Sequence, residues 1–262
     1  MNKHYIYRLV RLYFLPAALL FIGVASGILA ICCIVSGDTA ICDNIEMWIE
    51  ACSYMDFFFP LVVCIPFVPL VYYQKRRGFW RYASIRCGRN RYIKFNLISM
   101  ALMTVFSTAM AYFVTLVISV KVLRPIYTYD TSRLINYALG YYEVNHPFLF
   151  GAVWCLWKGL IAFLFVLFGS MLVLYTENLF VSVLSPFIYC MAENMITALL
   201  GFPEYSIVTT YVLNRLSPDA MHGFSYVCGV FTYIITAFLI ILFVNYKDKV
   251  KYGYKPMSCN GL

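Results

Sequence analysis

Long apolar runs are the feature that most restricts what this chain of 262 residues can fold into. Hydrophobic residues make up 63% of the sequence and charged residues only 12%, whereas about 25% charge is typical of a soluble domain. A helix needs about 20 apolar residues to cross the hydrocarbon core of a bilayer. The runs that we expect to cross are residues 12–36, 56–74, 95–120, 150–175, 179–201 and 225–245.

These runs are continuous and show no alternation with a period of two, which favours helices over the strands of a barrel. No linker rich in Gly, Ser or Pro divides the chain. We therefore expect residues 1–262 to form a single transmembrane domain of the all-α class, with six membrane-spanning helices.

Positive charges are distributed unevenly between the two sets of segments that flank these runs. On one side, three Lys and Arg residues precede the first run, eight lie between the second and third, and four follow the last, whereas the other side has only four. Basic segments resist translocation, so the richer side is expected to be cytoplasmic and to hold both termini. The net charge of +8 is thus a signal of topology and gives no reason to expect nucleic-acid binding.

The segment between the second and third runs, residues 75–94, is more elaborate than a retention signal requires, and we call it the basic loop. Residues 79–86 can form two helical turns, and Gly88 is a natural residue to end them. Arg and aromatic side chains dominate binding hot spots, so this helix is suited to docking against a partner protein. The basic residues of the loop are Lys75, Arg76, Arg77, Arg81, Arg86, Arg89, Arg91 and Lys94.

Three further segments complete the expected order of structural elements along the chain. The first dozen residues either form an amphipathic helix on the inner membrane surface, with the chain turning upward at Pro16, or simply supply a basic flank. Residues 175–178 are a very short inner connection, which makes the fourth and fifth runs antiparallel neighbours. Residues 202–213 are apolar but too broken to cross, and we expect a re-entrant hairpin in the outer leaflet.

Taken together, this order resembles the membrane subunit of a type-2 ATP-binding-cassette (ABC) exporter. At the level of residues the resemblance is concentrated in 85–94, where Ile85 and a short polar segment lead to Arg91, the Tyr92–Ile93 pair and Lys94 at the start of the third run. The layout is similar over most of the chain.

The resemblance implies a coupling helix that docks into a separate ATP-hydrolysing subunit, with Glu177 in a smaller second contact. Glu177 has an alternative role as a cap of the fifth helix. Two copies of the chain, or this chain and a related one, would form the complete permease. The chain lacks the G-x-x-x-x-G-K-[ST] motif, so no cofactor is expected on it, and ATP and Mg²⁺ would bind the partner. The coupling residues would be Phe79, Trp80, Arg81, Tyr82, Ser84, Ile85 and Arg86.

Three polar residues within the runs are candidates for a substrate path. An ionised Glu193 in hydrocarbon costs at least ~2.5–3.5 kcal/mol, so it should face the bundle interior, pair or be protonated. Its role is either structural, as a partner across helices, or, with neighbouring Asn194, part of transport. Lys158 lies near the expected outer interface, which favours an anchor that reaches water over contact with a substrate.

No pattern typical of a metal site or a catalytic centre is present. The three His residues are scattered and no CxxC pair occurs, so neither a metal site nor an enzyme is expected. Cys42 and Cys52 share an outer connection and are the one pair of cysteines positioned for a possible disulfide.

These features lead to one expected function and two alternatives. We expect a multi-pass permease of the bacterial plasma membrane that exports a hydrophobic or amphipathic substrate, such as an antimicrobial-type peptide, for secretion or self-immunity. The alternatives are a substrate-capturing membrane subunit of a partner-driven importer, and a membrane accessory or enzyme subunit.

Overall fold

The computed structural model describes residues 3–36, 41, 43–78, 89–123, 135–137, 139–176 and 178–251, and among these the side chains of all except 3–10, 89–91 and 245–251. Over these ranges the chain forms helices and no strand. Their order is α1 (Lys3–Val35), α2 (Asn44–Asp56), α3 (Phe59–Arg76), α5 (Arg89–Lys121), α7 (Gly140–Asn145), α8 (Pro147–Tyr175), α9 (Leu179–Leu199), η1 (Pro203–Tyr205), α10 (Ile207–Tyr211), η2 (Pro218–Ala220) and α11 (Ser225–Lys251).

The helices confirm the predicted all-α class with several apolar segments long enough to cross a membrane. Five such segments meet this criterion individually, and α2 with α3 makes a sixth if the bent pair counts as one span. The two helices of that pair meet at 58°. The second predicted run, 56–74, therefore corresponds to α3 alone. The five single segments are Arg11–Val35, Tyr92–Lys121, Pro147–Tyr175, Leu179–Leu199 and Ser225–Val244.

Residues 56–60 explain why the second span is broken. The N–H of Phe58 donates to the carbonyl of Met55 at 3.2 Å, a tight turn that ends α2. Pro60 lies in the first turn of α3 and has no N–H to offer the carbonyl of Asp56, four residues before it. The helical ladder is interrupted at this point, and the chain restarts as α3 in a new direction.

Helix α8 is the central helix of the bundle. Of its most apolar window 61% is buried, compared with 17% in α9 and in α11. A Cβ at Gly159 would lie 2.9 Å from the carbonyl oxygen of Val105 in α5, and one at Gly169 would lie 2.8 Å from that of Ser182 in α9. Small residues thus allow α8 to approach both neighbours closely, as is common between membrane helices.

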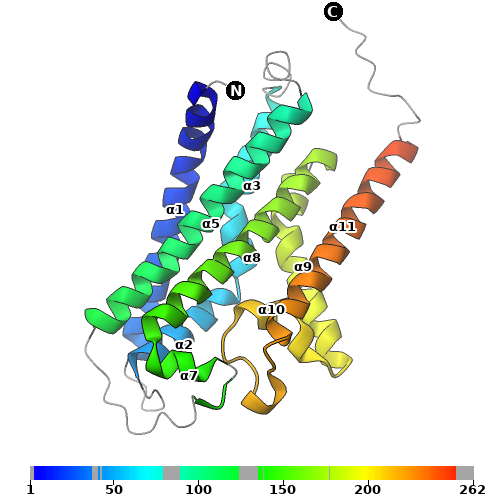
Figure 1. Ribbon diagram of the computed structural model, residues 1–262. Helices are drawn as coiled ribbons and strands as arrows, with labels where there is room; N and C mark the ends of the chain where they lie inside the picture. The colour runs from blue at the N-terminus through cyan, green and yellow to red at the C-terminus, as the bar shows by residue number, and fades with distance from the viewer. Residues whose placement is uncertain are drawn as a thin grey trace, which may run out of the picture.

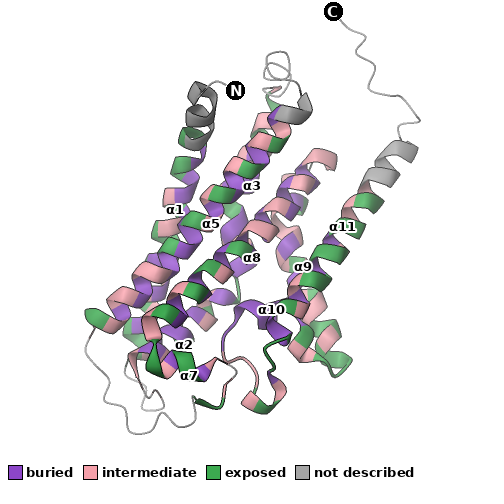
Figure 2. Cartoon of the chain, in the orientation of Figure 1, coloured by how far each residue is buried: buried purple, intermediate pink, exposed green. Residues whose placement is uncertain are grey.

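The two ends of the bundle differ (Figure 1). The start of α1, the end of α3, the end of α8 and the end of α11 lie at one end, which we call the terminal end, while α2, α7 and α10 lie at the opposite end. Large apolar side chains such as Leu15, Phe180 and Leu199 are exposed on the outward faces, as the green segments of Figure 2 indicate. Such faces are unfavourable in water but suit a hydrocarbon environment.

Helix α1 differs from expectation at Pro16. Within the described residues it continues from Lys3 to Val35 as one helix with Pro16 in its interior. Pro16 is buried, and neighbouring helices allow proline inside membrane helices without a break. The first residues therefore extend the helix that contains the first apolar segment, Arg11–Val35.

Residues 202–213 do not form a crossing helix, as expected. They contain the short helices η1 and α10, and every residue of α10 is buried. The segment lies at the opposite end, between α9 and α11 in the chain (Figure 1). Whether it enters the outer leaflet stays a prediction.

Candidate functional site

At the terminal end, Lys75 of α3 binds the last turn of α8. Its Nζ donates hydrogen bonds to the carbonyl oxygens of Val173 and Leu174 at 2.8 and 2.9 Å. No N–H of the helix donates to these two carbonyls, because α8 ends at Tyr175. A cation there also interacts favourably with the negative end of the helix dipole. Lys75 therefore joins two helices where both of them end.

Hydrogen bonds stabilise both ends of the connection from α8 to α9. The N–H and the hydroxyl of Thr176 both donate to the carbonyl of Leu172, at 2.8 and 2.9 Å. Oδ1 of Asn178 accepts from two amides at the start of α9, at 2.9 and 3.4 Å, and so caps that helix. The structure places α8 and α9 side by side in opposite directions, as the short connection predicted.

A second set of bonds lies next to Lys75 along α3. The hydroxyl of Tyr13 donates to Oδ1 of Asn96 at 2.7 Å, and Nδ2 of Asn96 donates to Oε1 of Gln74 at 3.0 Å. Tyr13 and Asn96 are fully buried, where polar groups need partners. We call Tyr13, Gln74, Lys75 and Asn96 the terminal belt, because together with the end of α8 it connects α1, α3, α5 and α8.

Deeper in the bundle, an ion pair lies at the break between α2 and α3. Nζ of Lys158 lies 2.5 Å from Oδ2 of Asp56, and each side chain is only 1% exposed. Tyr112 donates its hydroxyl to Oδ1 of Asp56 at 2.7 Å, and its ring centroid lies 4.2 Å from the ammonium nitrogen. A buried charge without its partner is strongly unfavourable, so each of these charges depends on the other.

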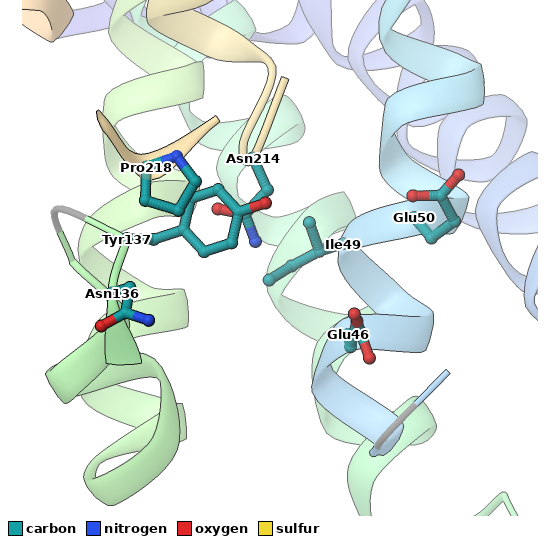
Figure 3. Close-up of a pocket in the computed structure, with 7 residues that line it drawn as sticks. All are labelled: Glu46, Ile49, Glu50, Asn136, Tyr137, Asn214 and Pro218. Atoms are coloured by element: carbon teal, nitrogen blue, oxygen red, sulfur yellow. The ribbon is translucent and has the colours of Figure 1, made fainter. Parts of the chain in front are cut away.

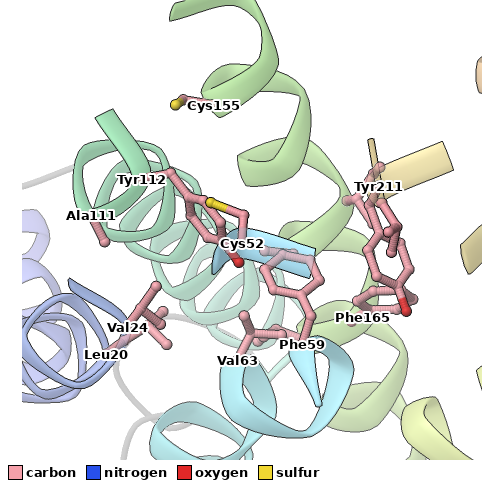
Figure 4. Packing of buried hydrophobic residues seen from close by; sticks show 14 of the residues in the cluster. Leu20, Val24, Cys52, Phe59, Val63, Ala111, Tyr112, Cys155, Phe165 and Tyr211 are labelled. Carbon is pink, nitrogen blue, oxygen red and sulfur yellow. The ribbon is translucent and has the colours of Figure 1, made fainter. Parts of the chain in front are cut away.

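The surroundings of this pair are apolar. The rings of Tyr112 and Phe59 meet edge-on with their centroids 6.1 Å apart, and Figure 4 shows Cys52 beside them. Lys158 therefore does not reach water as an interfacial anchor, which differs from expectation. The physical reason is that the bend after Asp56 brings a carboxylate to α8, and the bend could not be inferred from residue order.

Glu193 and Asn194 of α9 face the start of α10. The carboxylate of Glu193 accepts the hydroxyl of Ser206 at 2.8 Å and lies 3.2 Å from the N–H of Ile207. It therefore satisfies an amide that has no partner within the helix. Of the two interpretations of Glu193, the structural one now has named partners, whereas a substrate path through Glu193, Asn194 or Lys158 stays a prediction.

Arg215 completes this network from the segment after α10. Its guanidinium donates to Oδ1 of Asn194 at 2.6 Å and to the hydroxyl of Thr209 at 3.1 Å. Burial lowers the pKa of Arg215, while the negative charge of Glu193 acts in the opposite direction. The network links α9, α10 and the chain that leads to α11.

A polar cavity of about 320 Å³ opens at the opposite end. Figure 3 shows Glu46, Ile49 and Glu50 of α2 on one side and Tyr137 and Asn214 on the other. Its lining is acidic, unlike the apolar interior of the bundle. The remaining lining residues are Asn136 and Pro218.

Glu143 of α7 lies close to this cavity and is 2% exposed. Burial raises its pKa to about 7, the charges of Asp43 and Glu46 add to the rise, and a hydrogen bond with Asn214 opposes it. The carboxyl group therefore changes its charge near neutral pH.

All eight of the predicted coupling residues lie outside the described part of the chain. These are Phe79, Trp80, Arg81, Tyr82, Ser84, Ile85, Arg86 and Glu177. The docking helix therefore stays a prediction. Cys42 also lies outside the described residues, whereas Cys52 is a buried free thiol and is not part of a disulfide. Among the described residues, no group of His, Cys, Asp and Glu is arranged to hold a metal ion.

Asp56 and the terminal belt were not predicted as site residues. A signal for Asp56 exists, since Asp56 and Lys158 are opposite charges in two different apolar runs and such charges tend to pair. No comparable signal marks Lys75, because it is one of eight basic residues in the same loop.

The fold and these internal polar groups define an all-helical protein of the multi-pass membrane class. Comparisons with protein-family models, curated proteins and solved structures found no match to this chain.

Removing one member of the Asp56–Lys158 pair should destabilise the protein more than removing both. Asp56→Leu or Lys158→Met leaves an uncompensated buried charge, which costs about 3–5 kcal/mol, whereas the double variant leaves none. Each of the three variants is heated in detergent, and its unfolding midpoint is the temperature at which half of the monodisperse chromatographic peak is lost. Lys121→Met, which removes an exposed lysine, is the control. If the double variant lost as much stability as the two single variants together, the pairing would be contradicted.

Glu143→Gln should remove a pH dependence of stability. The pKa of this carboxyl is about 7 in the folded protein and 4.5 ordinarily, so between these values the folded state holds a proton that the unfolded state has released. Its contribution is fully present below pH ~4.5 and is lost as the pH rises to ~7. Unfolding midpoints measured from pH 4.5 to 8 should therefore fall more steeply for wild type than for Glu143→Gln. The control is Glu50→Gln, at an exposed position. Parallel curves of midpoint against pH for wild type and Glu143→Gln would contradict the prediction.

Proposed function

We propose that this chain is the permease subunit of an ATP-driven transporter of the type-2 ABC exporter class. Its substrate would be hydrophobic or amphipathic, such as an antimicrobial-type peptide. The complete transporter would contain two permease subunits in the bacterial plasma membrane and a separate ATP-hydrolysing subunit that binds ATP and Mg²⁺. This chain has no phosphate-binding loop of its own.

The observation that carries the proposal is the position of two connections. The basic loop leaves α3 and the 176–178 connection leaves α8 at the end of the bundle where α1 begins and α11 ends. By the distribution of basic residues this end would face the cytoplasm, where an ATPase has access to it. A partner that binds both connections would act directly on α3, α5, α8 and α9.

The interior of the bundle supports an apolar or amphipathic substrate more than an ionic one. The charged groups Asp56 and Lys158 are paired with each other and fully buried. Glu193 is occupied by Ser206 and Ile207. These contacts leave the described spans with mainly apolar side chains on their surfaces.

Trp80→Ala combined with Arg81→Ala should separate membrane insertion from ATP-driven activity. If residues 79–86 dock against an ATPase, the double variant should insert normally but lose at least tenfold in stimulated ATP hydrolysis, because aromatic and Arg side chains dominate such interfaces. ATPase activity is measured with the cognate ATPase after reconstitution in liposomes.

The matched control is Arg124→Ala combined with Tyr127→Ala, an arginine and an aromatic residue in the connection at the other end of α5. This control should stimulate hydrolysis like wild type. Wild-type stimulation by the Trp80/Arg81 variant would reject the docking assignment, and the absence of any ATPase partner for the wild type would reject the proposed function.

A further inference from the structure

Lys75 differs from the basic residues that follow it. Arg76 and Arg77 are exposed, whereas the side chain of Lys75 is partly buried and its Nζ contacts two carbonyls of α8. The ammonium group is therefore placed by a neighbouring helix and not by solvent. A residue that serves only to retain a loop in the cytoplasm needs no such contact.

The carbonyls that Lys75 binds belong to the last turn of α8, where a helix has no N–H groups of its own to offer them. The carbonyl of Leu172 is taken by Thr176, and those of Val173 and Leu174 are taken by Lys75. A helix end without partners frays. Lys75 therefore holds in place the last turn of α8 and, with it, the start of the connection to α9.

Gln74, the preceding residue, makes the equivalent contact with another helix. It accepts a hydrogen bond from Asn96 of α5, which in turn accepts one from Tyr13 of α1. Successive residues of α3 thus bind helices on two sides. The end of α3 is thus connected to α8 through Lys75 and to α5 through Gln74.

We infer that Lys75 is a positioning residue that makes the end of α3 and the end of α8 move as one body. This inference rests on the proposed function, in which an ATPase acts on the basic loop and on the 176–178 connection. Because Lys75 joins the helices from which these two segments leave, a movement imposed on one is passed to the other. Both pairs of helices, α3 with α5 and α8 with α9, then change position together.

The contact itself is tested by hydrogen–deuterium exchange of the full chain in nanodiscs. Lys75→Met removes the donor but keeps an unbranched stem, and it should speed exchange of the amides in the last turn of α8 about fivefold, which corresponds to ~1 kcal/mol. Lys75→Arg keeps a cationic donor and should remain near wild type. Arg76→Met, which removes an exposed charge from the same helix end, should not change this exchange. Equal exchange in Lys75→Met and wild type would overturn the inference.

The positioning role is tested in liposomes with the cognate ATPase. Lys75→Met should still co-purify with the ATPase and permit hydrolysis, but it should transport at least threefold less substrate per ATP than wild type, and Lys75→Arg should restore the ratio. An unchanged ratio in Lys75→Met, with faster exchange in α8, would show a structural contact only and would overturn the positioning role. If wild type shows no ATP-dependent transport, the proposed function is rejected, and the positioning role of Lys75 is rejected with it. A failure of the positioning role alone is recognised by an unchanged ratio in Lys75→Met when wild type does transport substrate.

Discussion

Hydrocarbon offers polar groups no hydrogen-bond partner, and this constraint governs how the interior of the bundle is arranged. The strongest case is the pair of Asp56 and Lys158, which neutralise each other at the break between α2 and α3. Tyr112 satisfies the second carboxylate oxygen and covers the ammonium group with its ring. Because one charge comes from a helix break and the other from the central helix, the pair fixes the bent span against α8.

The same constraint gives the two ends of the bundle different characters. At the terminal end, the belt of Tyr13, Gln74, Lys75 and Asn96 joins helices by their ends. At the opposite end, Glu193 and Arg215 hold the short helix α10 and the chain around it. A bundle connected in this way is expected to respond to a force at its terminal end as connected helices and not as independent ones, which is the property that a partner-driven permease needs.

The sequence was sufficient for the broad architecture, and it singled out Glu193, Asn194 and Lys158, whose partners only the structure shows. The apolar runs predict the helices because hydrophobic length is a local property. The bend after Asp56 and the contact of Lys75 with α8 depend on how distant segments pack, and periodicity does not report that. Lys158 illustrates the limit, since its place near the expected outer interface indicated an anchor, while its real partner, Asp56, is 102 residues away in the chain. One of the two interpretations of the first residues had the chain turning at Pro16, but Pro16 is buried and α1 continues through it.

The central claim is that the terminal end, with the basic loop, faces the cytoplasm. Its most direct test inserts a protease site after Gly78 in one variant and after Thr128 in another, and exposes sealed vesicles of known orientation to the protease. With the proposed orientation, the site after Gly78 is cut only from the cytoplasmic face and the site after Thr128 only from the external face. Cleavage of the Gly78 insertion from the external face would contradict it.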